Sequence, residues 1–186
     1  MDIILYAFLF VLFIPFYSYF IYPAILFIFG KVAHKRYIIN ENNLPTVSII
    51  IAAYNEEKVI AKKIENLQSI DYPKDKIMFI VGSDGSSDNT YSILESYSND
   101  IQNLKAINLP RGGKTRTLNK LINIAKGEIF IFSDANTMYS PNAIRELVKY
   151  FSDKRIGCVS GQLKYAVNSE TGDGAKSEGV YWKYEN

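Results

Sequence analysis

The chain has 186 residues, enough for a single domain of ordinary size, and its formal net charge is only +2. The first 36 residues hold three of the 21 basic residues and one of the 19 acidic ones, which leaves 18 of each sign in the remainder. A domain without excess positive charge is not typical of nucleic-acid-binding proteins, which usually present a basic face. The single Cys158 excludes an intramolecular disulfide and agrees with a reducing compartment.

An uncharged apolar segment, residues 3–29, opens the chain. As a helix it would be about 40 Å long, enough to cross a bilayer core of about 30 Å. We therefore predict a transmembrane segment over residues 1–30. Pro15 and Pro23 predict a kink or two shorter pieces, which leaves a re-entrant hairpin as an alternative. A cleaved secretory signal is disfavoured, because no basic residue precedes the segment and because the segment is too long.

Basic residues follow the apolar segment directly, at Lys31, Lys35 and Arg36. Only Asp2 and the amino terminus precede it, so the positive-inside tendency predicts that the rest of the chain lies in the cytoplasm, at the inner or plasma membrane. Residues 31–45 are polar and end in a proline, which predicts a basic juxtamembrane linker. The folded domain is expected over residues 46–186.

From residue 46 onward the apolar pattern alternates between strand and helix periods. Residues 46–53 form a continuous apolar run, typical of a strand covered on both faces, and Ile60, Ile64 and Leu67 then share one face of a helix predicted over residues 55–70. Strands are predicted next at 76–83, 104–108 and 128–133, separated by helices at 91–98 and around 118–125. This series predicts an α/β fold with a mostly parallel sheet.

Two further signals predict helix ends. Gly127 is a candidate stop for the helix that precedes the fourth strand. Ser140 as N-cap and Pro141 at the first helical position predict the start of a last helix, which would continue through Phe151.

Polar loops follow all four predicted strands, with the sequences YNEE, SDGSSD, PRGGK and SDAN. Ligands of such sheets bind beyond the carboxyl ends of the strands, so one cleft could collect all four loops. Acids there repel a phosphorylated ligand unless a divalent cation intervenes, and Mg²⁺ or Mn²⁺ binds carboxylate, amide and phosphate oxygens together. Asp134 is therefore the best candidate metal ligand, whereas Asp84 suits hydrogen bonds from neutral donors such as a base or a ribose.

One segment competes with this interpretation, since NLPRGGKT (residues 108–115) ends in the Gly-Lys-Thr of a phosphate-binding P-loop. Asn108 stands where the first glycine is required, and Pro110 removes a backbone N–H donor. No G-x-G-x-x-G follows any predicted strand. A P-loop and a dinucleotide fold are both disfavoured.

Five segments occur in a fixed order along the chain: IIIAAYNEE, SDGSSDNT, GGKTRTLNK, IFSDANT and VSGQL. Together they resemble the front half of a membrane-bound family-2 glycosyltransferase with a GT-A catalytic fold, the Rossmann-like fold of nucleotide-diphospho-sugar transferases. The resemblance covers nearly the whole chain, including the leading apolar segment.

The resemblance implies roles for individual residues. The aspartate matching Asp84 contacts the uracil or ribose of a UDP-sugar, and Lys114 lies near the nucleotide or its phosphates. Asp134 belongs to the D-x-D signature, which brings Mg²⁺ or Mn²⁺ to the diphosphate and stabilises the departing UDP. The loop that lines the nucleotide pocket corresponds to Ala53, Tyr54, Asn55 and Glu56.

The chain departs from the family pattern in two places. Asn136 stands where the second acid of the signature is expected, so metal binding should be weaker, with Asn136 either a second ligand or a turn residue. The general base that deprotonates the acceptor hydroxyl is not found. It is expected beyond Asn186, so the GT-A domain is expected to be incomplete at its C-terminus.

Two hypotheses of different class follow. The first is the donor-binding portion of an inverting glycosyltransferase, which moves a sugar from a UDP-sugar to a glycan or lipid-linked acceptor at the cytoplasmic membrane face. The second is a catalytically inactive, membrane-anchored protein that binds nucleotide-sugar or serves as a scaffold. Asp84 and Asp134 also have a simpler interpretation as turn or capping residues, and Lys114 as a solvated charge.

Overall fold

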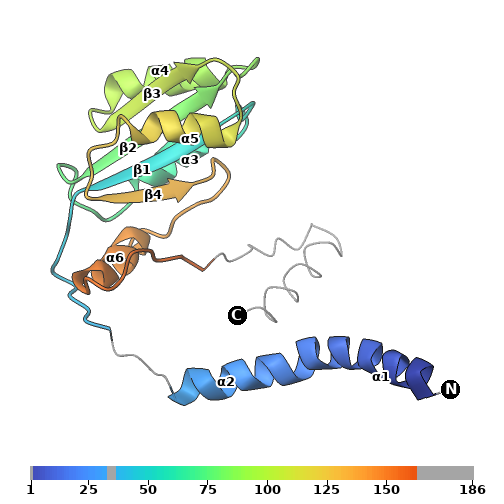
Figure 1. The fold of residues 1–186 in the computed structure, drawn as a ribbon. Helices are drawn as coiled ribbons and strands as arrows, with labels where there is room; N and C mark the ends of the chain where they lie inside the picture. The colour runs from blue at the N-terminus through green and yellow to red at the C-terminus, as the bar shows by residue number, and fades with distance from the viewer. Residues whose placement is uncertain (1, 33–36, 163–186) are drawn as a thin grey trace, which may run out of the picture. The chain divides into compact units, whose positions relative to one another are not determined.

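The computed structural model describes residues 2–32 and 37–162. The chain divides after Ile38 into two compact units, which are drawn in Figure 1. Lys35 and Arg36 of the basic flank lie outside the described residues, as does Leu163 at the end of the VSGQL motif.

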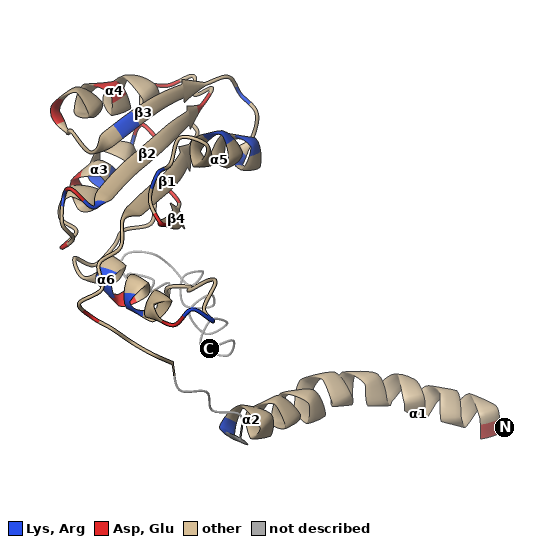
Figure 2. Ribbon diagram, turned by 60° about the vertical axis from the view of Figure 1, so that its left-hand side comes forward, with Lys and Arg blue, Asp and Glu red and all other residues tan. Residues whose placement is uncertain are grey.

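The first unit is one apolar helix in three parts: α1 (Asp2–Phe16), the π-helical turn η1 (Tyr17–Ile21) and α2 (Tyr22–Val32). The wide turn comes just before Pro23, whose missing N–H and bulky ring disturb the regular hydrogen-bond ladder. The segment Asp2–Lys31, with a mean hydropathy of 2.1, is long and apolar enough to cross a bilayer. Its charged residues lie only at its two ends (Figure 2). The helix is continuous and does not fold back as a hairpin.

The second unit is built on a four-stranded parallel sheet in the order β3–β2–β1–β4. The strands are β1 (Val47–Ala53), β2 (Ile77–Asp84), β3 (Leu104–Leu109) and β4 (Ile129–Ser133). Every residue of β1 except Ala52 is buried, which explains its unbroken apolar run. At the edge, β4 alternates in exposure and leaves Phe130 and Phe132 open to solvent. The predicted parallel α/β architecture is confirmed.

Helices cover both faces of this sheet (Figure 1). The larger core lies on one face, where α3 (Ile60–Gln68), α4 (Thr90–Asp100) and α6 (Ala143–Val148) contribute buried side chains. On the other face, α5 (Lys114–Ile122) packs through Leu121 against Ile50 and Ile80. A 3₁₀ turn, η2 (Lys149–Ser152), follows α6.

Two predicted helix starts are wrong. The helix expected from residue 55 begins at Ile60, because Asn55 adopts a left-handed conformation (φ 55°) that ends β1 in a separate loop. The last helix begins at Ala143 and not at Pro141. Ser140 precedes it as a turn residue, whose backbone carbonyl accepts a hydrogen bond from the Ala143 N–H at 3.0 Å.

Gly127 is also not a helix stop, since α5 already ends at Ile122. Its N–H donates to Ser48 Oγ at 3.0 Å. A Cβ at this position would lie 2.5 Å from the Ser48 nitrogen, so the close approach to β1 requires glycine.

Candidate functional site

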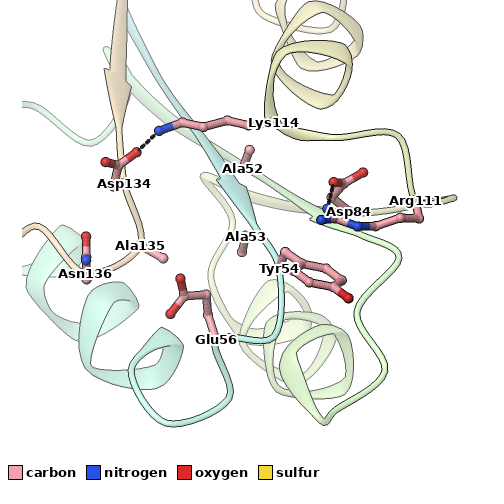
Figure 3. Close-up of a pocket in the computed structure, with 10 residues that line it drawn as sticks. All are labelled: Ala52, Ala53, Tyr54, Glu56, Asp84, Arg111, Lys114, Asp134, Ala135 and Asn136. Atoms are coloured by element: carbon pink, nitrogen blue, oxygen red, sulfur yellow. Dashed lines mark hydrogen bonds and ion pairs between the residues drawn. The ribbon is translucent and has the colours of Figure 1, made fainter.

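A cleft of about 330 Å³ lies beyond the carboxyl ends of the strands. β2 lies on one side of β1 and β4 on the other, so the chain reverses its direction across the sheet here, the usual position of ligand sites in open parallel sheets. The ends of β1 and β2, the loops after β1, β3 and β4, and the start of α5 line the cleft (Figure 3), through Ala52, Ala53, Tyr54, Glu56, Asp84, Arg111, Lys114, Asp134, Ala135 and Asn136. Every predicted site residue except Asn55 is among them.

Asn55 instead ties the loop after β1 to the loop after β2. Its backbone N–H donates to Ser86 Oγ at 3.2 Å, and its side-chain oxygen accepts from the Ser87 N–H at 2.9 Å. Two residues on, the Glu57 N–H donates to Asp88 Oδ2 at 3.1 Å. These crossed hydrogen bonds hold the two loops together and so support the cleft from outside.

Asp84 anchors another loop, residues 111–113. Its side chain is 2% exposed, and it accepts from the Gly112 N–H at 2.7 Å, the Gly113 N–H at 2.9 Å and the Arg111 guanidinium. Burial alone would raise the pKa of Asp84, but these donors and the Thr117 hydroxyl hold it below its usual value. The carboxylate is therefore an ionised part of the framework, and a direct contact with a base or ribose stays a prediction.

The same hydrogen bonds exclude the P-loop interpretation. In a P-loop the backbone N–H groups of the glycine-rich segment are directed to phosphate. Here the N–H groups of Gly112 and Gly113 bind a carboxylate of the chain itself. Lys114, which follows them, begins α5 and extends its side chain across the cleft.

Arg111 lies in the cleft although no sequence motif singled it out. Its guanidinium carbon lies 3.5 Å from the centroid of the Tyr54 ring, so the two side chains stack and form one wall. Gly85, with φ 62°, permits the approach, because a Cβ there would lie 2.6 Å from the Arg111 nitrogen. The signal in the sequence was an arginine beside Gly-Gly in a loop that follows a strand.

Lys114 and Asp134 form an ion pair across the cleft (Figure 3). The ammonium nitrogen lies 2.5 Å from Asp134 Oδ1, and the side chains are 61% and 54% exposed. An ion pair so open to water contributes little to stability, so a ligand can displace either partner at small cost. The resemblance placed Lys114 near the nucleotide or its phosphates and Asp134 at the metal of the diphosphate, and the fold brings the two side chains together.

Asp134 and Asn136 present oxygen ligands for a divalent cation at the cleft, which the Glu56 carboxylate also lines. Ala135 between them is 2% exposed and packs into the core, while its two neighbours are exposed at the cleft. Within residues 2–32 and 37–162 no group of three His, Cys, Asp or Glu side chains could hold a metal ion. A carboxylate and an amide oxygen, completed by water and phosphate oxygens, nevertheless suit Mg²⁺ or Mn²⁺.

A buried lysine lies beneath the same loop and was missed in the sequence. Lys63 Nζ donates to Ser133 Oγ at 2.9 Å and to the Thr137 carbonyl. Burial lowers the pKa of Lys63 to about 8, against the opposing effect of the Asp134 charge. The sequence did contain a signal for this residue, because Lys63 lies on the helical face that also carries Ile60 and Ile64. A lysine on a core-facing side of a helix is rare unless it has a partner.

Comparison with known proteins gives a consistent result. Residues 48–185 match the family model described as "Glycosyl transferase family 2". The beta-monoglucosyldiacylglycerol synthase of Trichormus variabilis is 34% identical over 130 residues, which are 68% of this chain and 27% of that protein. The poly(ribitol-phosphate) beta-N-acetylglucosaminyltransferase TarS of Staphylococcus aureus is 30% identical over 108 residues, 57% of this chain and 19% of that protein.

Solved structures share the fold. The mannosyltransferase PcManGT from Pyrobaculum calidifontis, in complex with GDP-Man and Mn²⁺, superposes with a TM-score of 0.68 at 26% identity, over 78% of this chain and 45% of that one. S. aureus TarS 1–349 in complex with UDP-GlcNAc gives a TM-score of 0.50 at 30% identity, over 54% of this chain and 29% of that one. The chain spans between 26% and 31% of the length of the first four curated relatives.

Proposed function

Because the chain belongs to glycosyl transferase family 2, we propose that it is the donor-binding portion of a glycosyltransferase that takes its sugar from a UDP-sugar. The observation that carries this proposal is the meeting of Asp134, Asn136 and Lys114 at one end of the cleft, from two different elements. A carboxylate, an amide and a displaceable ammonium together suit a diphosphate with its cation. The UDP-GlcNAc held by TarS, and the GDP-Man and Mn²⁺ held by PcManGT, support the same ligand class.

In this proposal Asp134 and Asn136 would hold Mg²⁺ or Mn²⁺ through their side-chain oxygens. The bound cation would neutralise charge on the diphosphate and on the departing UDP. Lys114 would release the Asp134 carboxylate and so leave it free to act as a ligand. Its ammonium would then donate to a phosphate oxygen. The ion pair within the chain would thus be replaced by two attractive contacts, that of Lys114 with the phosphate and that of Asp134 with the cation.

The nucleoside is proposed to lie against the loop of Ala53, Tyr54 and Glu56, with the stacked pair of Tyr54 and Arg111 as its wall. An aromatic ring backed by a guanidinium presents a flat surface on which a base can stack. Asp84 would act mainly by holding the Arg111 loop in place. Asn55 would act in the same indirect way, through the loop that follows β2.

The acceptor is proposed to be a glycan or a lipid-linked molecule at the cytoplasmic membrane face. One of its hydroxyls would attack the anomeric carbon of the donor sugar in an inverting reaction, and UDP would leave. Three curated relatives are named beta-monoglucosyldiacylglycerol synthase, which favours a lipid acceptor. The apolar helix Asp2–Lys31 would anchor the protein at the membrane where such an acceptor resides.

Calorimetric titration of the whole chain in detergent tests the donor site. UDP and GDP are each added with EDTA, with Mg²⁺ or with Mn²⁺, to the unchanged chain and to Asp134→Asn. We expect the cation to tighten UDP binding at least about tenfold in the unchanged chain, and not in Asp134→Asn. The control is Asp75→Asn, which removes an exposed acid at the opposite end of β2 and should behave as the unchanged chain. Equal affinity with and without the cation would refute the proposal.

A membrane-anchored protein that binds nucleotide-sugar without turnover would give the same titration. The two hypotheses separate when the chain, extended by any coding sequence that follows Asn186, is incubated with radiolabelled UDP-glucose or UDP-GlcNAc and a membrane lipid extract. Labelled lipid and free UDP in equal amounts would support transfer. Binding without either product would support the inactive alternative.

A further inference from the structure

Lys63 is a buried cation on the otherwise apolar inner face of α3. It lies on the inner face of α3 with Ile60, Ile64 and Leu67, and its relative exposure is 0%. Removing an ammonium from water costs several kcal/mol unless hydrogen bonds and opposite charges compensate for the loss. The compensation at this position comes from the segment that carries the candidate metal ligands.

The ammonium contacts the two ends of the loop between Ser133 and Thr137. Its nitrogen donates to Ser133 Oγ at 2.9 Å and to the backbone carbonyl of Thr137. It also lies 4.5 Å from the centroid of the Tyr139 ring, so its charge meets an aromatic face as well. One side chain therefore connects the residue before Asp134 to the residue after Asn136.

The same helix fixes the chain beyond the loop. Asn66, nearly one turn after Lys63, donates through its side-chain nitrogen to the Tyr139 carbonyl at 2.8 Å and accepts from the Tyr139 N–H at 2.7 Å. Ala135 adds an apolar contact, since it is buried in the same core. Residues 133–139 are thus held from beneath by α3 while Asp134 and Asn136 face the cleft (Figure 3).

We propose that Lys63 is a positioning residue for the donor site: by joining Ser133 to Thr137, it sets the direction in which Asp134 and Asn136 present their oxygens to the cation. This inference rests on the proposed function, and it adds a residue that never touches the ligand. Partners that orient metal ligands in this way commonly change metal affinity by about 10- to 100-fold when they are removed.

The requirement is stronger here than in a site with two acids. Asp134 supplies the only carboxylate in the loop, and Asn136 adds an uncharged oxygen, so the cation gains little from electrostatic attraction alone. Binding then depends on both oxygens having the correct geometry at the same time. A loop closed only by the hydrogen bond from the Thr137 N–H to the Asp134 carbonyl, at 3.3 Å, would not fix that geometry.

The test uses Lys63→Met in the whole chain in detergent, since methionine keeps most of the length and removes both donated hydrogen bonds. The measured quantity is the metal-dependent gain, defined as the Kd of UDP with EDTA divided by its Kd with saturating Mn²⁺. We expect this gain to fall about tenfold while the Kd with EDTA changes less than about twofold. Lys62→Met is the matched control, because Lys62 is next to Lys63 on the same helix but is exposed. This variant should keep the full gain.

A merely structural role would weaken binding with and without Mn²⁺ to the same degree, or would weaken neither. A folded Lys63→Met protein with the unchanged gain would overturn the inference. Should Lys63→Met not fold, Ser133→Ala takes its place, because it removes one acceptor only and is expected to lower the gain about threefold. An unchanged gain in Ser133→Ala would likewise overturn the inference.

The failure of this inference can be told from the failure of the proposed function. If the unchanged chain shows no metal-dependent binding of UDP or GDP, the proposed function fails, and the role of Lys63 falls with it. If the unchanged chain shows the gain and a folded Lys63→Met, or Ser133→Ala in its place, retains it, only the role of Lys63 is wrong.

Discussion

The cleft has two acidic sides that differ in almost every physical respect. On the side of β2, Asp84 is 2% exposed and is surrounded by donors from its own chain. On the side of β4, Asp134 is 54% exposed and is paired with one exposed lysine, Lys114. The same residue type is therefore part of the framework in one place and open to solvent in the other.

The difference follows from desolvation. A buried carboxylate must replace all its lost water contacts with fixed donors, and those donors then determine the local structure. An exposed carboxylate keeps its water, so its ion pair with Lys114 can be exchanged for a cation at little cost. We infer that the Asp84 side is preformed, whereas the Asp134 side changes partners when a ligand binds.

Of the substitutions that test the difference between the two acids, Asp84→Asn is expected to have the largest effect, a loss of stability. The substitution removes the negative charge that pairs with Arg111 and leaves a buried backbone N–H donor poorly paired. The free energy of unfolding should therefore fall by about 2 to 3 kcal/mol. Urea denaturation of the whole chain in detergent measures it. Asp134→Asn is the comparison and should change stability by less than about 0.5 kcal/mol. Equal losses in the two variants would contradict the contrast.

Asn136→Asp sharpens the contrast by restoring the second acid of the signature. A second carboxylate beside Asp134 should tighten Mn²⁺ binding about tenfold, because the cation then meets two negative charges. Electron paramagnetic resonance of free Mn²⁺ reports the affinity directly. Asn99→Asp, at an exposed position of α4, is the control for added charge. No gain over this control would show that Asn136 is a turn residue and not a ligand.

The buried lysine predicts a pH dependence of stability. The pKa of Lys63 is about 8 in the folded chain and about 10.5 when unfolded, so between these values the unfolded state binds more protons. Stability relative to Lys63→Met should therefore rise as the pH increases from 7 to 9.5, by about 1 kcal/mol.

Two other ionisable groups face Lys63 in the structure. They are Asp134 and Tyr139, and burial raises the pKa of Tyr139 above its usual value, so its hydroxyl stays protonated in this range. Denaturation curves at the two pH values measure the effect. A constant difference between the two proteins would mean that Lys63 is not desolvated as the structure indicates.

Lys114→Met is expected to give the smallest effect. The exposed ion pair contributes little, so the free energy of unfolding should stay within about 0.5 kcal/mol of the unchanged value. UDP affinity in the presence of Mn²⁺ should fall about threefold, because one charged donor to the phosphates is lost. Calorimetry measures the affinity. A loss of stability larger than that of Asp84→Asn would reverse the proposed roles of the two sides.

Several features of the fold could be predicted from short stretches of sequence. The unbroken apolar run at Ile49, Ile50 and Ile51 indicated a strand buried on both faces, and it forms the centre of the sheet. The uncharged segment at the start indicated one long apolar helix. Asp84, Lys114 and Asp134 were placed at strand ends, and the sheet brings all three to one cleft.

Other features were missed because they depend on contacts between distant residues. Asn55 faces the loop after β2 because its backbone is left-handed, a state that no periodic pattern predicts. Arg111 enters the cleft because Gly85, on a different loop, leaves room for its backbone. Gly127 is needed for its approach to Ser48, 79 residues earlier, and not for ending a helix.

Hydrophobic period and residue type act over a few neighbouring positions, so they were enough to indicate the parallel α/β class, the apolar helix and the acids at the strand ends. The state of each acid was decided elsewhere. Whether a carboxylate is buried or exposed depends on which loops the strand order β3–β2–β1–β4 brings beside it. Lys63 meets Ser133 across 70 residues of chain, and only the packing of α3 beneath β4 makes that contact.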